Sequence, residues 1–373
     1  MLQAKNFFER NLISIKTHSG EQHYGFPVAE GKKRITEWGA TSAGLRALLW
    51  LGASSPIVSS KCESAKQWLL TQQQNGAWEA SGFFSAEATA GVLLDLLSVG
   101  VADDEVAGKA LEFINLCYRK GYYASTPTST EKPHIYTTYL VVRCLAARGR
   151  LEKKDEIKNW VLESQTSSGM WGRGPDANIE SLVHTIYAYQ ILHLCGVTKD
   201  ELLASFGDTL RTTIKRSTEV TYVYEEIEVE QQASDLAGIK YHRLRIQHFA
   251  LPNLGNLCIA VGNRHTAFST ARKLLEEQFA GGWGPSNDEL TMWATVQAIE
   301  YLHSFKTKIL PYMSTMDYLL YWTDLIPYRL AKLCLSFVGL AVLIIFLLTP
   351  NYRQNLLVGV FLIIVPWLFA RGK

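Results

Sequence analysis

The chain has 373 residues, of which 47% are hydrophobic, 11% aromatic and 19% charged, and its net charge is +2. This composition excludes an intrinsically disordered chain, because such chains lack the apolar and aromatic residues that build a core. The near-neutral charge, without any basic block, also argues against a protein that binds nucleic acid through phosphates. The six cysteines are dispersed, with no CxxC pair, which is typical of small core residues in a reducing compartment.

Residues 1–34 form an N-terminal extension in front of the first recognisable repeat. Charged residues are scattered through its first half, and no apolar stretch follows them. A secretory signal peptide needs such a stretch, so we expect none here.

A motif that ends in Gly-x-Trp occurs three times in the following part of the chain. The copies are WLLTQQQNGAW at 68–78, WVLESQTSSGMW at 160–171 and KLLEEQFAGGW at 273–283. An amphipathic helical segment leads into each copy, and a strongly apolar helical segment follows it. Weaker copies lie at 35–52, at 120–149 and near 250–262, which makes about six repeats in total.

This alternation of half-exposed and buried helices predicts an all-α fold, an (α/α)6 toroid of helical-hairpin repeats over residues 35–305. The amphipathic helices would form the outer ring, because one of their faces must meet water, and the apolar helices the inner barrel. An insertion at about 219–247 interrupts the helices. Residues 219–230 and 239–247 alternate with the period of strands, the first acidic and the second basic. They predict a β-ribbon, with cross-strand ion pairs in the simple interpretation and a lid or docking element in the functional one.

The end of the chain predicts a hairpin of two transmembrane helices at 329–371. Two uncharged apolar runs, 333–348 and 356–370, flank a short turn with Pro350, and each approaches the length that spans a bilayer. Basic residues lie outside both runs, so we expect an integral membrane protein with the toroid and both termini on the cytoplasmic side. Aromatic residues before the hairpin predict an interfacial linker at 306–328. A re-entrant or interfacial hairpin is the alternative.

The Gln…Gly-x-Trp element resembles the QW repeat of the terpenoid cyclase and protein prenyltransferase superfamily, as in squalene-hopene cyclase-type α/α toroids, over roughly residues 35–305. In that family the glutamine stacks on the tryptophan and binds the backbone ends of neighbouring helices. The resemblance assigns this structural role to three pairs: Gln73 with Trp78, Gln165 with Trp171, and Gln278 with Trp283. Such pairs indicate a fold and carry no information about a reaction.

The catalytic motifs of the family and of other toroids are missing. There is no DxDD motif of class II cyclases, the nearest match being residues 103–105, and no DDxxD motif of class I cyclases. The zinc ligands of protein prenyltransferases and lanthionine cyclases and the Cys-Gly-Glu-Gln thioester are not found either. The sequence therefore predicts no metal site and no cofactor, and it leaves open whether the chain is an enzyme.

Polar residues follow the Gly-x-Trp turns, where the inner helices begin and should converge on one end of the barrel. Seven of them are candidate ligand-binding residues: Glu87, His134, Asp176, Glu180, His184, Asp288 and Glu289. Paired carboxylates there could act as general acid and base. The competing interpretation is helix capping, which residues 286–289, Ser-Asn-Asp-Glu, fit as a capping box.

Aromatic residues on the inner helices also have two interpretations. They could line a cavity that stabilises a cation, as in cyclases, or they could simply fill the core. The residues concerned are Tyr136, Tyr139, Tyr187, Tyr189 and Trp293.

Three functions remain open. The first is a membrane-anchored binding module without catalysis, a scaffold or sensor whose hairpin anchors it or transmits a binding event. The second is an enzyme that acts on an isoprenoid or other lipid, and the third is a hydrolase or lyase that uses the rim carboxylates. The expected partners are membrane lipid, a hydrophobic or small-molecule ligand, and a protein partner or further copies of the chain, but no nucleic acid. We favour the first function because complete structural motifs occur without a known catalytic one.

Overall fold

The computed structural model describes residues 2–16, 20–32, 35, 40–52, 55–80, 83–100, 104–129, 132–175, 180–217, 222–232 and 239–313. The chain divides into two compact units, residues 1–310 and 311–373. The predicted hairpin at 329–371 and most of the predicted linker lie outside the described residues. Within the described ranges, no helix combines the length and the apolar character that a membrane span requires.

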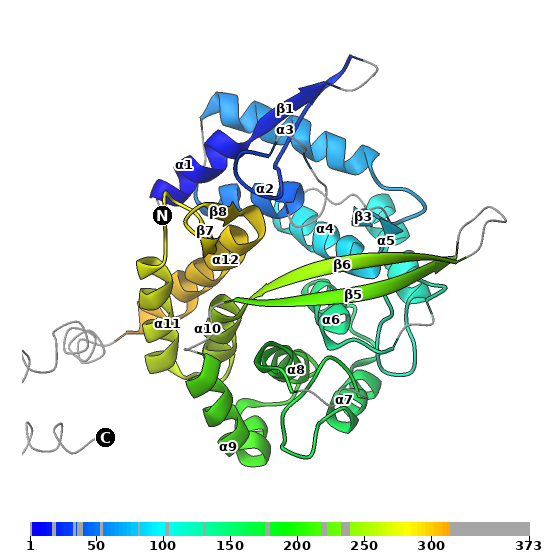
Figure 1. Cartoon of the computed structure of the whole chain (residues 1–373), viewed down its shortest axis with the longest axis vertical. Coiled ribbons are helices and arrows are strands. Elements are labelled where there is room, and N and C mark those ends of the chain that lie inside the picture. Colours follow the sequence, from blue (N-terminus) through cyan, green and yellow to red (C-terminus); the bar gives the residue numbers. More distant parts are fainter. Residues whose placement is uncertain are drawn as a thin grey trace, which may run out of the picture. The chain divides into compact units, whose positions relative to one another are not determined.

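Six helices of the first unit form a closed inner ring. They are α2 (Ser42–Trp50), α4 (Ala86–Ser98), α6 (Ile135–Ala147), α8 (Leu182–Leu194), α10 (Ala250–Ala260) and α12 (Met292–Lys308). Each packs against the next, and α12 packs against α2, which closes the ring (Figure 1). In α8, every residue from Val183 to Leu192 is buried. The predicted barrel of buried helices is therefore confirmed.

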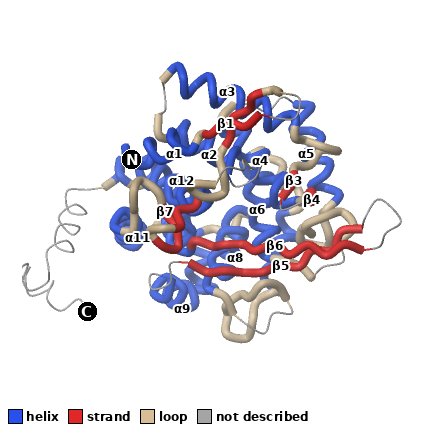
Figure 2. Tube along the Cα trace, turned by 45° about the horizontal axis from the view of Figure 1, so that its top comes forward, coloured by secondary structure: helices blue, strands red, loops and turns tan. Residues whose placement is uncertain are grey.

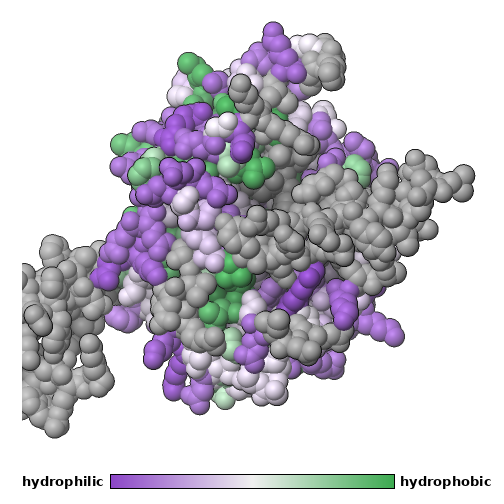
Figure 3. Space-filling view, in the orientation of Figure 1, coloured by the Kyte–Doolittle hydropathy of each residue, from purple (hydrophilic) through white to green (hydrophobic). Residues whose placement is uncertain are grey.

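A second set of helices lies outside this ring. They are α1 (Leu2–Asn11), α3 (Pro56–Thr71), α5 (Asp104–Leu116), α7 (Lys154–Glu163), α9 (Lys199–Ser217) and α11 (Arg264–Glu276). Each precedes one inner helix in the chain, and they bury one face only: in α7 the buried residues are Ile157, Trp160 and Val161. Hydrophilic residues accordingly dominate the perimeter in Figure 3. The two layers make the described part of the first unit an α/α toroid.

The N-terminal helix α1 completes the outer layer, although no repeat was found before residue 35. Arg10 of α1 donates from Nη2 to the carbonyl oxygen of Ala280, 2.8 Å away, in the turn after α11. A Cβ on Gly281 in the same turn would lie 2.1 Å from the carbonyl oxygen of Gln3. Helix α1 is thus packed against the end of α11, which joins the last outer helix to the first.

The glutamine and the tryptophan of each Gly-x-Trp motif donate hydrogen bonds to backbone carbonyls at or just before the turn; these paired residues are called staples below. Each indole Nε1 donates to the last turns of the preceding outer helix: Trp78 to Leu69 O at 2.8 Å, Trp171 to Val161 O at 2.6 Å and Trp283 to Leu274 O at 2.7 Å. Each glutamine Nε2 donates to the carbonyl of the motif glycine: Gln73 to Gly76 at 3.3 Å, Gln165 to Gly169 at 2.7 Å and Gln278 to Gly281 at 3.2 Å. These bonds hold the turn of each motif against the end of the outer helix before it, whereas the stacking of glutamine on tryptophan stays a prediction.

A threonine in the inner helices is a further staple, which the sequence pattern did not reveal. It is the fourth residue of α4, α6, α8 and α12. Its Oγ1 accepts a backbone N–H from the aromatic residue of the preceding turn: Thr89 from Trp78 at 3.2 Å, Thr138 from Tyr123 at 3.2 Å, Thr185 from Trp171 at 3.0 Å and Thr295 from Trp283 at 3.0 Å. The hydroxyl therefore fixes the start of each inner helix to the turn in front of it.

Short antiparallel strand pairs accompany the helices. They are β1 (Ile13–Lys16) with β2 (Gln22–Gly25), β3 (Glu79–Ala80) with β4 (Phe83–Phe84), and β7 (Trp283–Ser286) with β8 (Glu289–Thr291). The last pair shows that the predicted capping box at 286–289 is wrong, because Ser286 and Glu289 are paired across the hairpin. Helix α12 begins beyond the hairpin, and Thr291 caps it by accepting the N–H of Ala294 at 3.2 Å.

The predicted insertion is a long ribbon of β5 (Tyr222–Gln232) and β6 (Ile239–Phe249). The strands pair antiparallel, with Glu226 opposite Arg245 and Glu228 opposite Arg243 in the backbone register, which confirms the ribbon. The cross-strand ion pairs stay a prediction, since the side chains of residues 224–246 are outside the described set. Figures 1 and 2 both show the ribbon crossing one face of the ring, over the top of α6 in the view of Figure 1.

Candidate functional site

Three of the candidate ligand-binding residues are buried where the inner helices begin. Glu87 in the first turn of α4 is 1% exposed, and its Oε1 accepts hydrogen bonds from the hydroxyls of Ser125 and Thr137. His134 caps α6, its Nδ1 accepting the N–H of Tyr136 at 3.1 Å. The His134 and His184 rings lie edge to face, with centroids 5.4 Å apart. The structure therefore brings these three residues to the same end of the barrel.

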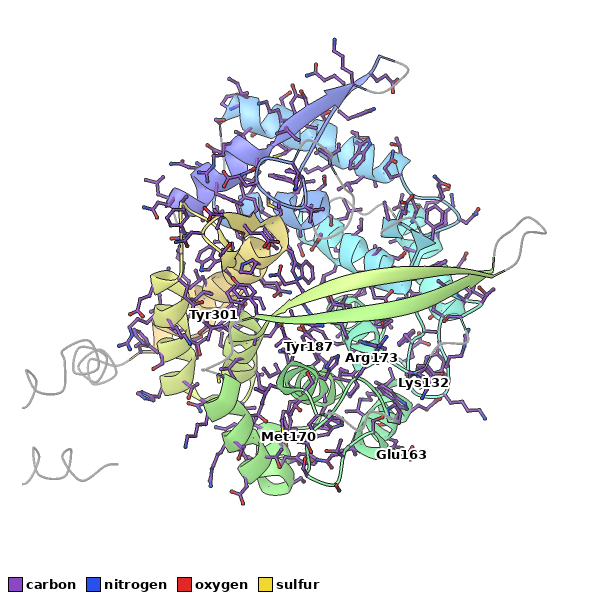
Figure 4. The ribbon with its side chains drawn as sticks, in the orientation of Figure 1. Lys132, Glu163, Met170, Arg173, Tyr187 and Tyr301 are labelled. Atoms are coloured by element: carbon purple, nitrogen blue, oxygen red, sulfur yellow. The ribbon has the colours of Figure 1, made fainter. Side chains whose placement is uncertain are left out.

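A third histidine joins this group from the base of the ribbon. His248 is fully buried, its ring centroid lies 5.7 Å from that of His184, and its Nδ1 lies 3.0 Å from the hydroxyl of Tyr187. His248 was not among the sequence candidates, because strand periodicity alone does not show that the last residues of β6 enter the ring. Figure 4 places Tyr187 in the interior of the ring.

The ribbon is attached to the ring beside this histidine cluster. The indole Nε1 of Trp293 in α12 donates to the carbonyl oxygen of Gln247 at 2.7 Å. The rings of Tyr222 and Phe249 stack at a centroid distance of 4.5 Å, which joins the two strands at the same place. One end of the ribbon is thus held by α8 and α12 together.

The remaining candidates do not join this group. Glu180, Asp288 and Glu289 are exposed, and Glu180 accepts a hydrogen bond from Thr166 at 3.3 Å. Asp288 and Glu289 belong to the β7–β8 hairpin. Asp176 lies outside the described residues. The arrangement therefore supplies one buried carboxylate, hydroxyls and imidazoles, a set that can hold a proton or a polar ligand but places no second candidate carboxylate beside Glu87 within the described ranges.

The predicted aromatic residues of the inner helices divide into two groups, one at the central cavity and one in the core. Tyr139 and Tyr187 stack at a centroid distance of 4.5 Å, and Tyr136 lies 5.4 Å from Tyr187. Tyr189 instead packs against Trp171, with centroids 5.2 Å apart. Core packing thus describes Tyr189, whereas the other tyrosines face the middle of the ring.

A cluster of four charged residues lies in the middle of the barrel and was not expected from the sequence. Arg46 of α2 contacts Asp95 of α4 at 3.0 Å and Glu300 of α12 at 3.1 Å. Arg143 of α6 also pairs with Glu300. A buried charge needs such partners, because its desolvation is otherwise expensive. The cluster connects α2, α4, α6 and α12 across the ring.

Burial and the neighbouring charges act differently on the two acids. Burial raises the pKa of Asp95, although Arg46 and the hydroxyl of Ser42, which donates to Asp95 at 2.8 Å, act against it. Burial would also raise the pKa of Glu300, but the guanidinium groups of Arg143 and Arg46 outweigh it and the pKa lies below its ordinary value. Glu300 is therefore the carboxylate that the two arginines stabilise in its ionised form.

A small cavity of about 40 Å³ lies at this cluster. All six inner helices contribute to its wall, with charged and amide side chains beside aromatic and aliphatic ones: Arg46, Asp95, Arg143, Asn253, Gln297 and Glu300 are its main polar residues. Since a water molecule needs about 10–15 Å³ of such space, the cavity holds a few waters at most. Among the described residues, no group of three or more histidine, cysteine or acidic side chains is arranged to hold a metal ion.

Fold and site together define an α/α toroid with a central cavity of about 40 Å³ at a cluster of charged residues. No protein-family model and no curated protein matches the sequence. Among solved structures, the GH76A α-1,6-mannanase from Salegentibacter sp. HEL1_6 is similar with a TM-score of 0.51 and 13% identity, covering 82% of this chain and 98% of that chain. The type II terpene cyclase MstE from Scytonema has a TM-score of 0.48 and 13% identity, covering 83% of this chain and 97% of that chain. At such identity the mannanase likeness supports the fold alone.

Proposed function

We propose that this chain is a membrane-anchored binding module, a scaffold or sensor built on an α/α toroid, and that it does not carry out the reactions of cyclases. The toroid would present the binding surface, and the hairpin predicted at 329–371 would hold it at a membrane. The observation that carries the proposal is the size of the central cavity. Pockets for organic ligands of the size of a drug or an isoprenoid measure about 300–1,000 Å³, whereas this one measures about 40 Å³.

The walls of the cavity support the same conclusion. An isoprenoid chain needs a long apolar channel, but ion pairs and amides cross the middle of this barrel. Placing an apolar chain there would require the desolvated charges to separate, which is expensive. Glu87, the buried acid at the barrel mouth, already accepts two hydroxyl hydrogen bonds. A hydrolase would need a pair of carboxylates at a shared cleft, and the other described candidate acids are exposed.

Native mass spectrometry of the full-length protein in mild detergent tests the proposal. We expect a ligand-free chain, a homo-oligomer, or a complex with a protein or a small polar molecule. A stoichiometric isoprenoid would contradict it and support the lipid enzyme. The matched control is Ala43→Val, which adds volume to the cavity wall. Lipid held inside the ring would be lost in this variant, whereas lipid around the hairpin would remain.

A further inference from the structure

The charged cluster at the central cavity contains one buried donor without an acceptor. Arg46 is 6% exposed, and among the described residues no atom accepts a hydrogen bond from its Nε. Its other nitrogens contact Asp95 and Glu300. An unsatisfied guanidinium N–H in a protein interior is costly. Because Arg46 also lines the cavity, a guest molecule there can supply the missing acceptor.

The four charged side chains are not buried equally. The side chains of Arg46 and Asp95 are 8% and 5% exposed, whereas those of Glu300 and Arg143 are 17% and 22% exposed. Arg46 and Asp95 therefore form the inner part of the cluster, and Glu300 with Arg143 forms the part nearer to water. Turning outward would return the Glu300 carboxylate to water over a shorter path than for Asp95, but it breaks the contacts with Arg46 and Arg143, so that a bound anion must replace those contacts.

Glu300 occupies the position that a free carboxylate would take. Its two oxygens contact the guanidinium groups of Arg46 and Arg143, one oxygen to each. Guanidinium groups recognise carboxylates through such charge-assisted hydrogen bonds. With Glu300 turned outward, Arg46, Arg143 and Asp95 would carry a net charge of +1, which matches a single negative charge. Asn253 and Gln297 line the same cavity, and Asn253 Nδ2 already donates to Phe249 O at 2.8 Å and to Gln297 Oε1 at 3.4 Å, so that Gln297 Nε2 is the amide donor that could contact an anion.

We propose that the central cavity binds a small carboxylate monoanion of the size of formate or acetate, and that Glu300 is the internal carboxylate that this ligand displaces. The volume of about 40 Å³ admits only a few non-hydrogen atoms while Glu300 is in place, and its movement adds room for the carboxylate group. This inference rests on the proposed function, since the carboxylate would be the small polar ligand that a sensor of this kind binds.

Titration of the full-length protein in detergent tests this inference. Sodium acetate is added at constant ionic strength against sodium chloride, with sodium phosphate as a third series, and binding is followed by calorimetry and thermal unfolding. We expect acetate to raise the melting temperature of the wild type more than chloride or phosphate does. Glu300→Gln should bind acetate at least about tenfold more tightly, since the competing charge is removed. Arg143→Met should bind it more weakly than the wild type.

The matched control is Glu163→Gln, which removes an exposed carboxylate from the outer side of the ring (Figure 4). It should bind acetate as the wild type does. The inference is overturned if neither the wild type nor Glu300→Gln binds acetate, in which case the cavity holds water only. Equal affinity in the wild type and Glu300→Gln, or a preference for phosphate, overturns it too. If Arg143→Met fails to fold, the comparison of acetate binding by the wild type and by Glu300→Gln still tests the inference. An isoprenoid in native mass spectra would contradict the proposed function separately.

Discussion

The backbone of Gly76 lies directly against the carbonyl oxygen of Lys109, so that a Cβ on Gly76 would lie 2.2 Å from that oxygen. Gly76 also has a φ of +82°, in the left-handed region that residues with a Cβ avoid. Two independent requirements for glycine therefore coincide in this turn. Helix α5, which contains Lys109, can approach the end of α3 only because that Cβ is absent.

Gly76→Ala should be considerably more destabilising than alanine at an unobstructed glycine. We expect a loss of about 3 kcal/mol or more, since the left-handed strain and the displacement of α5 add up. Gly100→Ala is the matched control, because Gly100 has a φ of +74° but no atom within 4 Å of the position that its Cβ would take. It should cost only the strain of about 1–2 kcal/mol. Equal losses in denaturant unfolding of the two full-length variants would show that the close approach is unimportant.

The threonine staple predicts that Thr185→Val destabilises the ring despite its nearly unchanged shape. Thr185 is fully buried, accepts the N–H of Trp171 at 3.0 Å and donates to the carbonyl of Ser181 at 2.8 Å. The valine would leave the Trp171 N–H unpaired, at a cost of about 1–3 kcal/mol. Thr212→Val on the exposed side of α9 is the control and should change the unfolding free energy by less than about 0.5 kcal/mol. A loss no larger than that in Thr185→Val would contradict the structural role.

The fold was predictable from the sequence where its signals are local. The spacing from Gln165 to Trp171 and the apolar character of α8 both lie within one repeat, so the motif and the buried helix could be recognised together. Helix α1 was not recognised because its place depends on contacts with residues 280 and 281 at the other end of the chain. The capping box failed for a different reason. Residues 286–289 have the composition of a helix start, but they form the turn of the β7–β8 hairpin, in which Ser286 pairs with Glu289.

The site was predictable only in part. The position of Glu87, His134 and His184 at inner-helix starts was enough to place them together, because those starts share one end of a ring. The charged cluster was missed because its four members lie on four inner helices far apart in the sequence, so that no local pattern joins them. A signal was nevertheless present: Arg143, Gln190 and Glu300 all lie five residues after the staple threonine of their helices. Aligning the inner helices on that threonine would have revealed a polar layer.

Asp95→Asn should change how the stability depends on pH. Burial raises the pKa of Asp95 in the folded chain above the ordinary value of 3.8. The folded state therefore holds this proton more tightly than the unfolded state does, and the resulting stabilisation is complete below that value and is lost as the pH rises through the folded pKa. The unfolding free energy of Asp95→Asn, relative to the wild type, should consequently increase as the pH rises from 3.8 through the folded pKa. Denaturant unfolding at several pH values measures this difference.

Two further variants make the pH measurement specific. Asp208→Asn removes an aspartate whose side chain is 99% exposed and is the comparison for losing a carboxyl group at the surface. Glu300→Gln should show the opposite slope at lower pH, because the pKa of Glu300 is lowered in the folded chain. The stabilisation by Glu300 is present above its ordinary value of 4.5 and is lost as the pH falls through the folded pKa. A flat difference for Asp95→Asn would contradict the described burial of its carboxyl group.

The membrane hairpin predicted from sequence makes the double substitution Val342→Arg with Ile344→Arg informative. Both positions lie in the middle of the first apolar run, where each arginine would oppose insertion by about 2.5–3.5 kcal/mol. We expect the full-length variant to move from the carbonate-resistant membrane fraction to the soluble or aggregated fraction. The control Val342→Leu with Ile344→Leu keeps the run apolar and should remain in the membrane. If the arginine variant stays as resistant to carbonate extraction as the leucine variant, the run does not cross the bilayer, and an interfacial hairpin becomes the better description.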